Sequence, residues 1–268
     1  MRQGRASIKD LLAAHGLKPQ RGLGQNFLAD PNLVDRIVRT ANLAIGDRVI
    51  EVGAGTGALT RALADTGASV VTYEIDRGLV PLLESVLAGT GVEIRAEDVT
   101  RVDLNAALGG GPWTMIANLP YNVGTPLVLD ALRHVPAIGR FVVMVQREVA
   151  DRFLAEPGTR SYGVPSIVVA LHAKARLAFT VPREVFYPMP DVESAVLEMS
   201  RIEPSPLAER AIELAGAVFR QRRKMLRRSL IGVIADPRDV LLRLGIADTA
   251  RPEDLAPRDF IELAGAVA

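Results

Sequence analysis

Short apolar runs that alternate with helix-like stretches constrain the fold of this chain more than any other feature. Between about residues 30 and 200, the β-rich runs are 48–52, 69–75, 92–96, 114–118, 140–146, 176–181 and 195–200. Helical spacing occurs over 30–41 and 57–65, and the first of these stretches begins with Asp30 as a potential N-cap followed by Pro31. Strands that alternate with helices predict a doubly wound α/β domain built on a parallel sheet.

A proline-rich connection and a linker divide the rest of the chain. The last two apolar runs are joined through Pro182, Pro188 and Pro190, which predicts a hairpin at one edge of the sheet. The segment 203–206, Glu-Pro-Ser-Pro, has the composition of a linker, and three or four helical patterns without strand signals follow it. We therefore expect a larger domain over 1–203, which includes an N-terminal segment 1–29, and a small helical domain over 204–268.

A glycine-rich loop follows the first strong strand. The sequence EVGAGTGALT (51–60) places Gly53, Gly55 and Gly57 between that strand and the next helix. Glycines there let the backbone turn sharply and let a ligand approach the main chain closely. Because Ala58 follows, the run also satisfies a loose G-x-G-x-x-A pattern for dinucleotides. A strand-to-helix turn without any ligand is the alternative.

Acidic residues stand at the ends of the next two strands. Glu74 lies about twenty residues after the glycine loop, where a carboxylate accepts hydrogen bonds from both ribose hydroxyls of an adenosine ligand. Asp98 ends the third strand, where it could accept a hydrogen bond from an adenine amino group. We assign both to a cofactor site with their neighbours Ile75 and Val99, although either acid alone could be a solvated surface group. These residues fit NAD and S-adenosylmethionine equally well.

The tetrapeptide Asn118-Leu119-Pro120-Tyr121 follows the fourth strand and suits transfer to an exocyclic amine. The N6 lone pair of adenine is delocalised into the ring, which makes this nitrogen a poor nucleophile. The side-chain carbonyl of Asn118 and the backbone carbonyl of Leu119 would accept the N6–H bonds, which favours a pyramidal nitrogen facing the methyl donor. Pro120 would fix the turn, and Tyr121 would stack on the base. Positioning and electrostatics then carry the reaction, so we predict methyl transfer instead of hydride transfer.

With these residues in place, the sequence resembles the ribosomal RNA adenine dimethyltransferases, and specifically their bacterial small-subunit members. The resemblance runs from Gly24 nearly to the C-terminus. Its motifs are GQNFL (24–28), EVGAGTGALT (51–60), YEID (73–76), ED (97–98), NLPYNVGTP (118–126), QREV (146–149), FYPMPDVESAV (186–196) and FRQRRKMLRRSL (219–230). The resemblance implies a Rossmann-like methyltransferase domain that uses S-adenosylmethionine, followed by a small helical domain that binds RNA.

The resemblance also implies roles that the physical argument leaves unassigned. Asn26 and Leu28 would contact the methionine end of S-adenosylmethionine, and Asn118 would lie between the cofactor and the target base. Phe186 would sandwich the target adenine opposite Tyr121, unless it belongs to the core. Members of the family usually dimethylate two adjacent adenines near the 3′ end of 16S rRNA. We accordingly expect a monomer that acts on an assembling small ribosomal subunit.

The positive charge of this chain is local, because its formal net charge is only +1. Residues 217–230 include no acid, and their basic residues are Arg220, Arg222, Arg223, Lys224, Arg227 and Arg228. We predict that this segment is a helix that contacts RNA phosphates, because adjacent like charges repel and a polyanion relieves that repulsion. A solvated basic helix face is the alternative.

Composition argues against several other classes of protein. The chain contains no cysteine, which excludes a disulfide framework and thiolate metal sites. His15, His134 and His172 stand alone without ligand spacing, so we expect no metal. No apolar run approaches the ~20 residues that a membrane helix needs, and the polar N-terminus lacks the apolar core of a signal peptide. We therefore expect a cytoplasmic protein without membrane contact.

Three other functions stay open at this point. A relative that modifies one adenine in large-subunit rRNA shares the fold and an N-[IL]-P-Y motif, but Leu119 and the basic segment favour the small subunit. A ribosome assembly factor without chemistry is disfavoured by the presence of Gly53, Glu74, Asp98 and Asn118. A nicotinamide-dependent oxidoreductase would be distinguished by ligand binding, because only S-adenosylmethionine or S-adenosylhomocysteine should stabilise a methyltransferase against heat.

Overall fold

The computed structural model describes residues 3–120 and 123–267 of the chain. The chain forms two compact units, of which the first comprises Met1–Ala150 and Arg176–Ser200 and the second Asp151–Ala175 and Arg201–Ala268. The transition after Ser200 lies close to the linker expected at 203–206. Residues 151–175 depart from the predicted division, because they belong to the helical unit and not to the larger domain.

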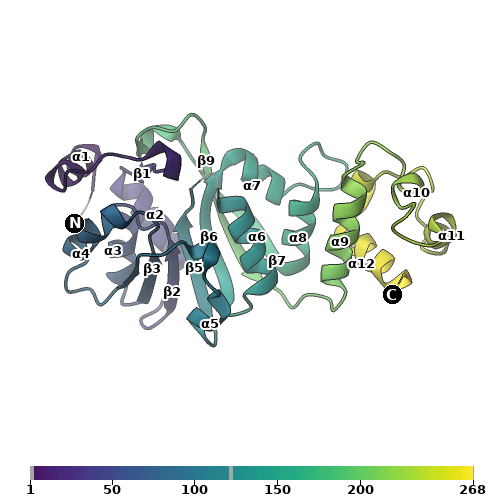
Figure 1. Cartoon of the computed structure of the whole chain (residues 1–268), viewed down its shortest axis with the longest axis horizontal. Coiled ribbons are helices and arrows are strands. Elements are labelled where there is room, and N and C mark those ends of the chain that lie inside the picture. Colours follow the sequence, from purple (N-terminus) through teal and green to yellow (C-terminus); the bar gives the residue numbers. More distant parts are fainter. Residues whose placement is uncertain (1–2, 121–122, 268) are drawn as a thin grey trace. The chain divides into compact units, whose positions relative to one another are not determined.

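The first unit is built around a sheet of seven strands, counted over the described residues (Figure 1). In spatial order these are β4 (Glu93–Arg95), β3 (Ser69–Tyr73), β2 (Arg48–Val52), β5 (Trp113–Asn118), β6 (Ile138–Gln146), β9 (Ser194–Arg201) and β7 (Ala173–Val181). The pairings from β4 through β6 are parallel, and β9 runs antiparallel to β6. Every predicted strand is present, and the doubly wound α/β fold class is confirmed.

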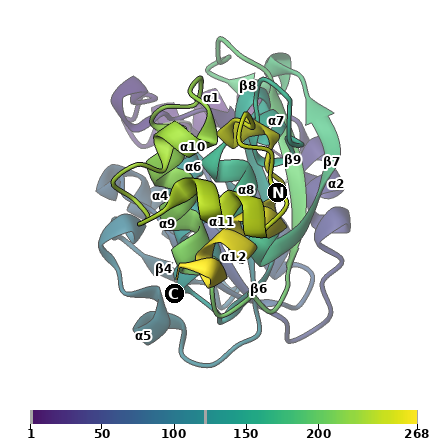
Figure 2. The same ribbon diagram turned by 90° about the vertical axis from the view of Figure 1, so that its right-hand side faces the viewer.

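Helices cover both faces of this sheet. Those packed against it include α2 (Pro31–Ala41), α3 (Ala58–Ala64), α4 (Val80–Val86) and α6 (Gly124–His134); α5 (Leu104–Leu108) lies between β4 and β5 in the chain, and α7 (Arg147–Phe153) follows β6. On β2, Val49 packs into the cluster formed with α2 and α3, whereas Ile50 points to the opposite face and is also 0% exposed. Figure 2 shows α2 and α6 on opposite sides of the sheet. Burial on both faces explains why the strands are continuous apolar runs.

The predicted start of α2 is confirmed. Asp30 is the N-cap, and its carboxylate accepts the N–H of Asn32 at 2.8 Å while Pro31 occupies the first turn. The predicted hairpin also agrees with the sheet order, because β9 and β7 are neighbours at the edge.

The N-terminal residues pack against the glycine-rich loop. Ile8 and Leu12 are buried in a cluster with Phe27. The side-chain amide of Gln3 donates to the carbonyl oxygen of Thr56 at 2.8 Å and accepts from the Thr56 hydroxyl at 2.6 Å. The elements of this region are α1 (Arg5–Ala14), the 3₁₀ turns η1 (Arg21–Leu23), η2 (Arg77–Leu79) and η3 (Val99–Arg101), and the antiparallel pair β1 (Phe27–Leu28) and β8 (Phe186–Tyr187).

The second unit is helical. Its helices are α8 (Val164–His172), α9 (Ala208–Phe219), α10 (Leu226–Ser229), α11 (Pro237–Arg243) and α12 (Pro257–Ala266). Figure 2 shows α8, α9 and α12 side by side, and their apolar faces share one core that contains Ile167, Leu214 and Phe260. This shared core is the reason that residues 151–175 join the C-terminal helices. None of the helices in the described part of the chain is long and apolar enough to cross a bilayer.

Candidate active site

A cavity opens at the carboxyl ends of β2, β3 and β5. Its free volume is about 1080 Å³ when the solvent space at its mouth is included. It lies where the strand order switches direction between β2 and β5, which is the position where doubly wound sheets bind ligands. The predicted site residues that line it are Asn26, Leu28, Gly53, Gly55, Glu74, Ile75, Asp98, Val99, Asn118, Leu119 and Pro120. Tyr121 lies outside the described residues.

Two glycines bring the loop after β2 close to the cavity. Gly53 has a φ of 80°, and its N–H donates to a carbonyl at the end of β3 at 2.8 Å. Gly55 has a φ of 57°, and a Cβ atom at this position would lie only 3.0 Å from the ring of Phe27. Both positions therefore require glycine. Gly57 does not line the cavity; a Cβ there would lie 3.2 Å from side chains of α4, so this glycine permits helix packing.

Glu74 presents a carboxylate that the backbone holds in place. Its Oε2 accepts the N–H of Gly55 at 2.9 Å, and its Oε1 accepts the N–H of Asp76 at 2.9 Å. The residue is 5% exposed, and burial raises the pKa of its carboxyl group. Each oxygen can accept a further hydrogen bond. Two fixed acceptors on one carboxylate match the two adjacent hydroxyls of a ribose.

Asp98 presents a second acceptor at the same cavity. Its Oδ1 accepts from the hydroxyl of Thr100 at 2.7 Å and from the Thr100 N–H at 3.0 Å, and these hydrogen bonds lower the pKa of the carboxyl group. Ile75, which is 50% exposed, and Val99 add apolar surface to the cavity. An ionised acceptor beside apolar side chains suits a flat ring that carries an amino group, such as adenine.

Asn118 occupies the end of β5, where its side chain is anchored. Its Nδ2 donates to the backbone carbonyl of Asn26 at 3.0 Å. The next residues are held by the backbone: the N–H of Leu119 donates to a β6 carbonyl at 3.1 Å, and the carbonyl of Pro120 accepts the N–H of Gly124 at 2.9 Å. Because the NH₂ group of Asn118 is used on Asn26, the amide oxygen is left for an incoming amine.

Phe186 is placed differently from the expectation that it sandwiches the target base. It does not line the cavity; its side chain is 0% exposed in the hydrophobic cluster beneath α2. In β8 it pairs with Leu28 of β1, which fixes its backbone beside the GQNFL segment. The aromatic ring therefore serves as a core residue in this conformation, and a base could reach it only after the segment moved.

Glu51 is a site residue to which the sequence analysis assigned no role. It lines the cavity from β2, is 1% exposed, and accepts the hydroxyl of Thr72 at 2.9 Å. Burial raises the pKa of Glu51 to about 7, and the nearby Glu74 carboxylate adds to the rise. The sequence signal was a charged residue inside an otherwise apolar strand.

Glu51 predicts a pH dependence of stability. In the unfolded chain Glu51 loses its proton near its ordinary pKa of 4.5, whereas the folded residue keeps its proton up to a pH of about 7. The folded state is therefore fully stable below pH 4.5, and it loses stability as the pH rises through 7. Glu51→Gln keeps a neutral group at this position and should not show this loss. Between about pH 4.5 and 8, the free energy of unfolding of the variant should therefore rise relative to that of the wild type by up to about 3 kcal/mol. Urea unfolding across this range measures the difference; parallel pH profiles for the two proteins would contradict it.

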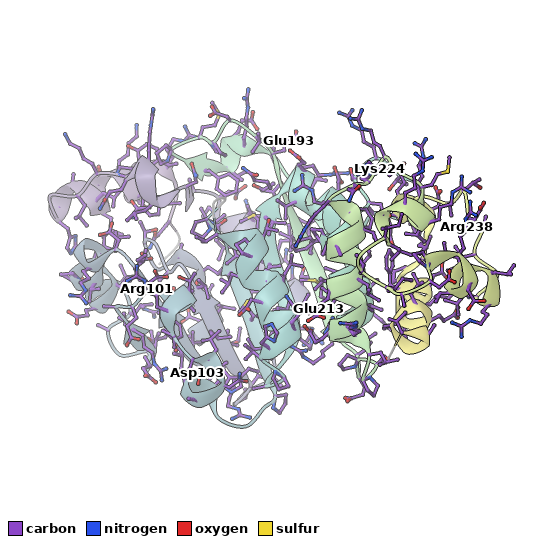
Figure 3. The ribbon with its side chains drawn as sticks, turned by 45° about the vertical axis from the view of Figure 1, so that its right-hand side comes forward. Arg101, Asp103, Glu193, Glu213, Lys224 and Arg238 are labelled. Carbon is purple, nitrogen blue, oxygen red and sulfur yellow. The ribbon has the colours of Figure 1, made fainter. Side chains whose placement is uncertain are left out.

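The basic segment is not the continuous helix predicted from the sequence. α9 ends at Phe219, a turn follows, and α10 begins at Leu226. Spacings such as Arg220 with Lys224 and Lys224 with Arg228 place like charges four residues apart, which disfavours a helix. Figure 3 shows Lys224 in the turn between α9 and α10.

The six predicted phosphate contacts fall into two groups. Arg222 and Arg227 hold the second unit together: the Arg222 Nε lies 2.5 Å from a carboxylate oxygen of Glu253, and Arg227 lies 2.6 Å from Asp248. Both arginine side chains are at most one-third exposed. The four exposed residues, which we call the basic turn, are Arg220, Arg223, Lys224 and Arg228.

Arg222→Ala should destabilise the second unit. The arginine also donates to the backbone carbonyls of Arg160 and Thr159 at 2.9 and 3.0 Å, and its loss leaves these acceptors and Glu253 without that partner. We expect a loss of about 1–3 kcal/mol in the free energy of unfolding. Arg223→Ala, at an exposed neighbour, should change it by less than about 0.5 kcal/mol. Denaturant unfolding of both variants measures this, and equal values would show that Arg222 is not a structural tie.

The chain is similar to several known proteins. The family described as "Ribosomal RNA adenine dimethylase" matches residues 16–268. The chain is 41% identical to the "Ribosomal RNA small subunit methyltransferase A" of Magnetococcus marinus, over 96% of this chain and 95% of the relative, and 41% identical to that of Leifsonia xyli, over 97% of each. Two solved structures are also similar. A dimethyladenosine transferase from Plasmodium falciparum is 25% identical with a TM-score of 0.76, over 88% of this chain and 95% of that one. The 23S rRNA methyltransferase ErmE is 26% identical with a TM-score of 0.70, over 90% of this chain and 99% of that one.

Proposed function

The chain belongs to the ribosomal RNA adenine dimethylase family, and from this premise we propose that it transfers methyl groups from S-adenosylmethionine to adenine N6 in small-subunit rRNA. The targets are two adjacent adenines near the 3′ end of 16S rRNA, which become N6,N6-dimethyladenosines. Relatives with 41% identity over nearly the whole chain carry a small-subunit name, whereas the solved 23S rRNA methyltransferase is 26% identical. This difference favours the small subunit over the large one.

One observation carries the proposal: Asn118 stands directly beside the glycine loop at the switch point of the sheet. Its backbone oxygen lies 3.7 Å from the position that a Cβ of Gly53 would occupy. The same cavity is lined by the two acids that suit an adenosine. An acceptor for an amine and a binding site for a nucleoside cofactor therefore share one cavity.

The residues present fit S-adenosylmethionine. Glu74 would accept both ribose hydroxyls, and Asp98 would accept the adenine amino group beside Ile75. Asn26 and Leu28 line the same cavity and would contact the methionine portion. When bound, the cofactor supplies an electrophilic methyl carbon on a positively charged sulfur.

The chain's own residues position the target amine. The Asn118 amide oxygen and the Leu119 carbonyl accept the N6–H bonds and turn the nitrogen lone pair toward the methyl carbon. No side chain has to remove a proton before the attack: the methyl carbon would exchange its bond to sulfur for a bond to N6, the electron pair of the broken bond would stay on sulfur, and the N6 proton would then pass to water. The second transfer to the same nitrogen uses the one remaining N6–H bond.

The basic turn supports RNA binding by the second unit. Its four exposed cations have no acid among residues 217–230 and suit a phosphate backbone. We assign this unit the RNA-binding role, and we place the protein in the cytoplasm as a monomer that acts on an assembling small subunit.

Transfer of labelled methyl groups to purified ribosomal subunits tests the proposal. Small subunits that lack the modification should accept label, and nucleoside mass analysis should find N6,N6-dimethyladenosine at two adjacent positions. Large subunits are the control. Label in large-subunit RNA would identify the alternative target, and no label in either subunit, with S-adenosylmethionine binding confirmed, would contradict methyl transfer to rRNA.

A further inference from the structure

Asp76 is a buried carboxylate at the edge of the cofactor site that the proposed mechanism does not use. It lies two residues beyond Glu74 and is 8% exposed. Its Oδ1 accepts the N–H of Gly78 at 3.0 Å, and its Oδ2 accepts from the side-chain amides of Gln20 at 2.8 Å and Gln25 at 2.7 Å. The Gly78 hydrogen bond is enough to cap the short turn, so the two glutamine hydrogen bonds to Oδ2 are additional to capping.

Both glutamines belong to the segment formed by residues 20–28, which we call the strap. The strap closes on itself through the N–H of Gln20, which donates to the Gln25 side-chain oxygen at 2.8 Å. Residues 23–28 line the cofactor cavity. Asp76 therefore anchors the proximal part of the strap to the end of β3, and the β1–β8 pairing holds its distal part.

The strap also decides the orientation of the Asn118 amide. The residue after Gln25 is Asn26, whose backbone carbonyl accepts the Asn118 Nδ2 at 3.0 Å. A carbonyl oxygen can only accept, so the NH₂ group must face the strap, and the amide oxygen is turned away from it. If Asn26 moved, the Asn118 amide could rotate and present its NH₂ group, which cannot accept a hydrogen bond from a target amine.

We propose that Asp76 is a positioning residue that locks the strap over the cofactor cavity and thereby sets the amide orientation of Asn118. The inference rests on the proposed function, because it depends on Asn118 acting as an acceptor for the amine. Asp76 itself does not line the cavity. It acts through Gln25 and Asn26, and its N–H additionally holds the Glu74 carboxylate at 2.9 Å.

Asp76→Asn tests this anchor with almost no change in size. The introduced amide keeps one acceptor for Gly78 but turns an NH₂ group toward two glutamine donors. We expect kcat to fall about tenfold, because the amine acceptor loses its orientation. Hydrogen exchange of the amides of residues 20–28, measured without cofactor, should become about tenfold faster.

Asp103→Asn is the matched control. Asp103 also caps a short helix, since its carboxylate accepts the N–H groups of Asn105 and Ala106 at the start of α5 (Figure 3). Asp103→Asn removes one negative charge, as Asp76→Asn does, but Asp103 does not contact the strap. This variant should keep the wild-type kcat and the wild-type exchange at residues 20–28.

A second substitution separates a specific hydrogen bond from general damage. In the Asp76→Asn background, Gln25→Glu provides a carboxylate to which the introduced amide can donate. The double variant should recover at least about half of the lost kcat on a logarithmic scale. Gln25→Glu alone places two carboxylates next to each other, and its kcat should be as low as that of Asp76→Asn. Such recovery is not expected if the substitution merely unfolds the strand end.

Three outcomes would overturn the inference. They are wild-type kcat in Asp76→Asn, unchanged exchange at residues 20–28, and a double variant no better than either single variant. The failure of the proposed function looks different: the wild type would then transfer no methyl group to rRNA, while the exchange experiment would still report whether Asp76 anchors the strap.

Discussion

Asn118→Ala is expected to reduce methyl transfer by about 10²- to 10³-fold, the scale seen when one preorganised hydrogen-bonding group is removed from an active site. In the proposed mechanism, the side chain removes no proton, and its amide oxygen holds one N6–H bond of the target. Because the Glu74 and Asp98 carboxylates stay in place, the affinity for S-adenosylmethionine should change by less than about threefold. Single-turnover transfer to small subunits and calorimetric cofactor binding measure the two quantities separately.

Asn105→Ala is the matched control for this prediction. Like Asn118, Asn105 donates its side-chain amide to a backbone carbonyl, in this case that of His134 at 2.8 Å, but it lies in α5 away from the cavity. It should transfer methyl groups at the wild-type rate. If Asn118→Ala were equally active, amine positioning by this residue would be wrong; if it lost cofactor binding in parallel with transfer, Asn118 would be a cofactor ligand instead.

Reversing the basic turn should weaken binding to the small subunit by about 10²- to 10³-fold near physiological salt. The variant carries Arg220→Glu, Arg223→Glu, Lys224→Glu and Arg228→Glu. Each phosphate contact that is lost also lowers the slope of log affinity against log salt by about 0.7 to 0.9. Equilibrium binding at several salt concentrations gives both numbers. Arg222 and Arg227 stay unchanged, because their ion pairs stabilise the second unit.

A charge-matched variant shows whether location matters. Arg39, Arg210, Arg243 and Arg258 are exposed helical residues outside the basic turn, and reversing all four changes the net charge by the same amount. The surface ion pairs that this disrupts contribute little to stability. This variant should lose clearly less affinity than the basic-turn variant. Equal losses would mean that net charge governs binding, and the basic turn would then be an ordinary solvated surface.

Much of the site could be predicted from the sequence because parallel strands bring their carboxyl ends to one edge. The strand pattern placed Gly53, Glu74, Asp98 and Asn118 at the ends of successive strands, and all of them line the cavity. The strand order, with β2 next to both β3 and β5, then sets these ends side by side. Resemblance to a family supplied Asn26 and Leu28, for which spacing offers no signal.

Other features depended on contacts that no short stretch of sequence contains. The segment 151–175 precedes the linker in the sequence, and only the apolar core that it shares with the C-terminal helices assigns it to the second unit. Phe186 has the same sequence signature whether it stacks on a base or is 0% exposed, as it is here. Arg222 resembles its basic neighbours until Glu253, thirty-one positions away, pairs with it.

The sequence by itself determined the strands, the glycine loop and the acidic strand ends, because periodicity and turn geometry act over a few residues. It also suggested the chemistry that we propose for Asn118. Tertiary structure alone decided which polar groups are paired and which are free to bind. The amide of Gln25 meets Asp76 across fifty-one positions, and that of Asn118 meets Asn26 across ninety-two. Such pairs form only after long loops have closed, so their partners are set by the packing of whole elements and not by local preference.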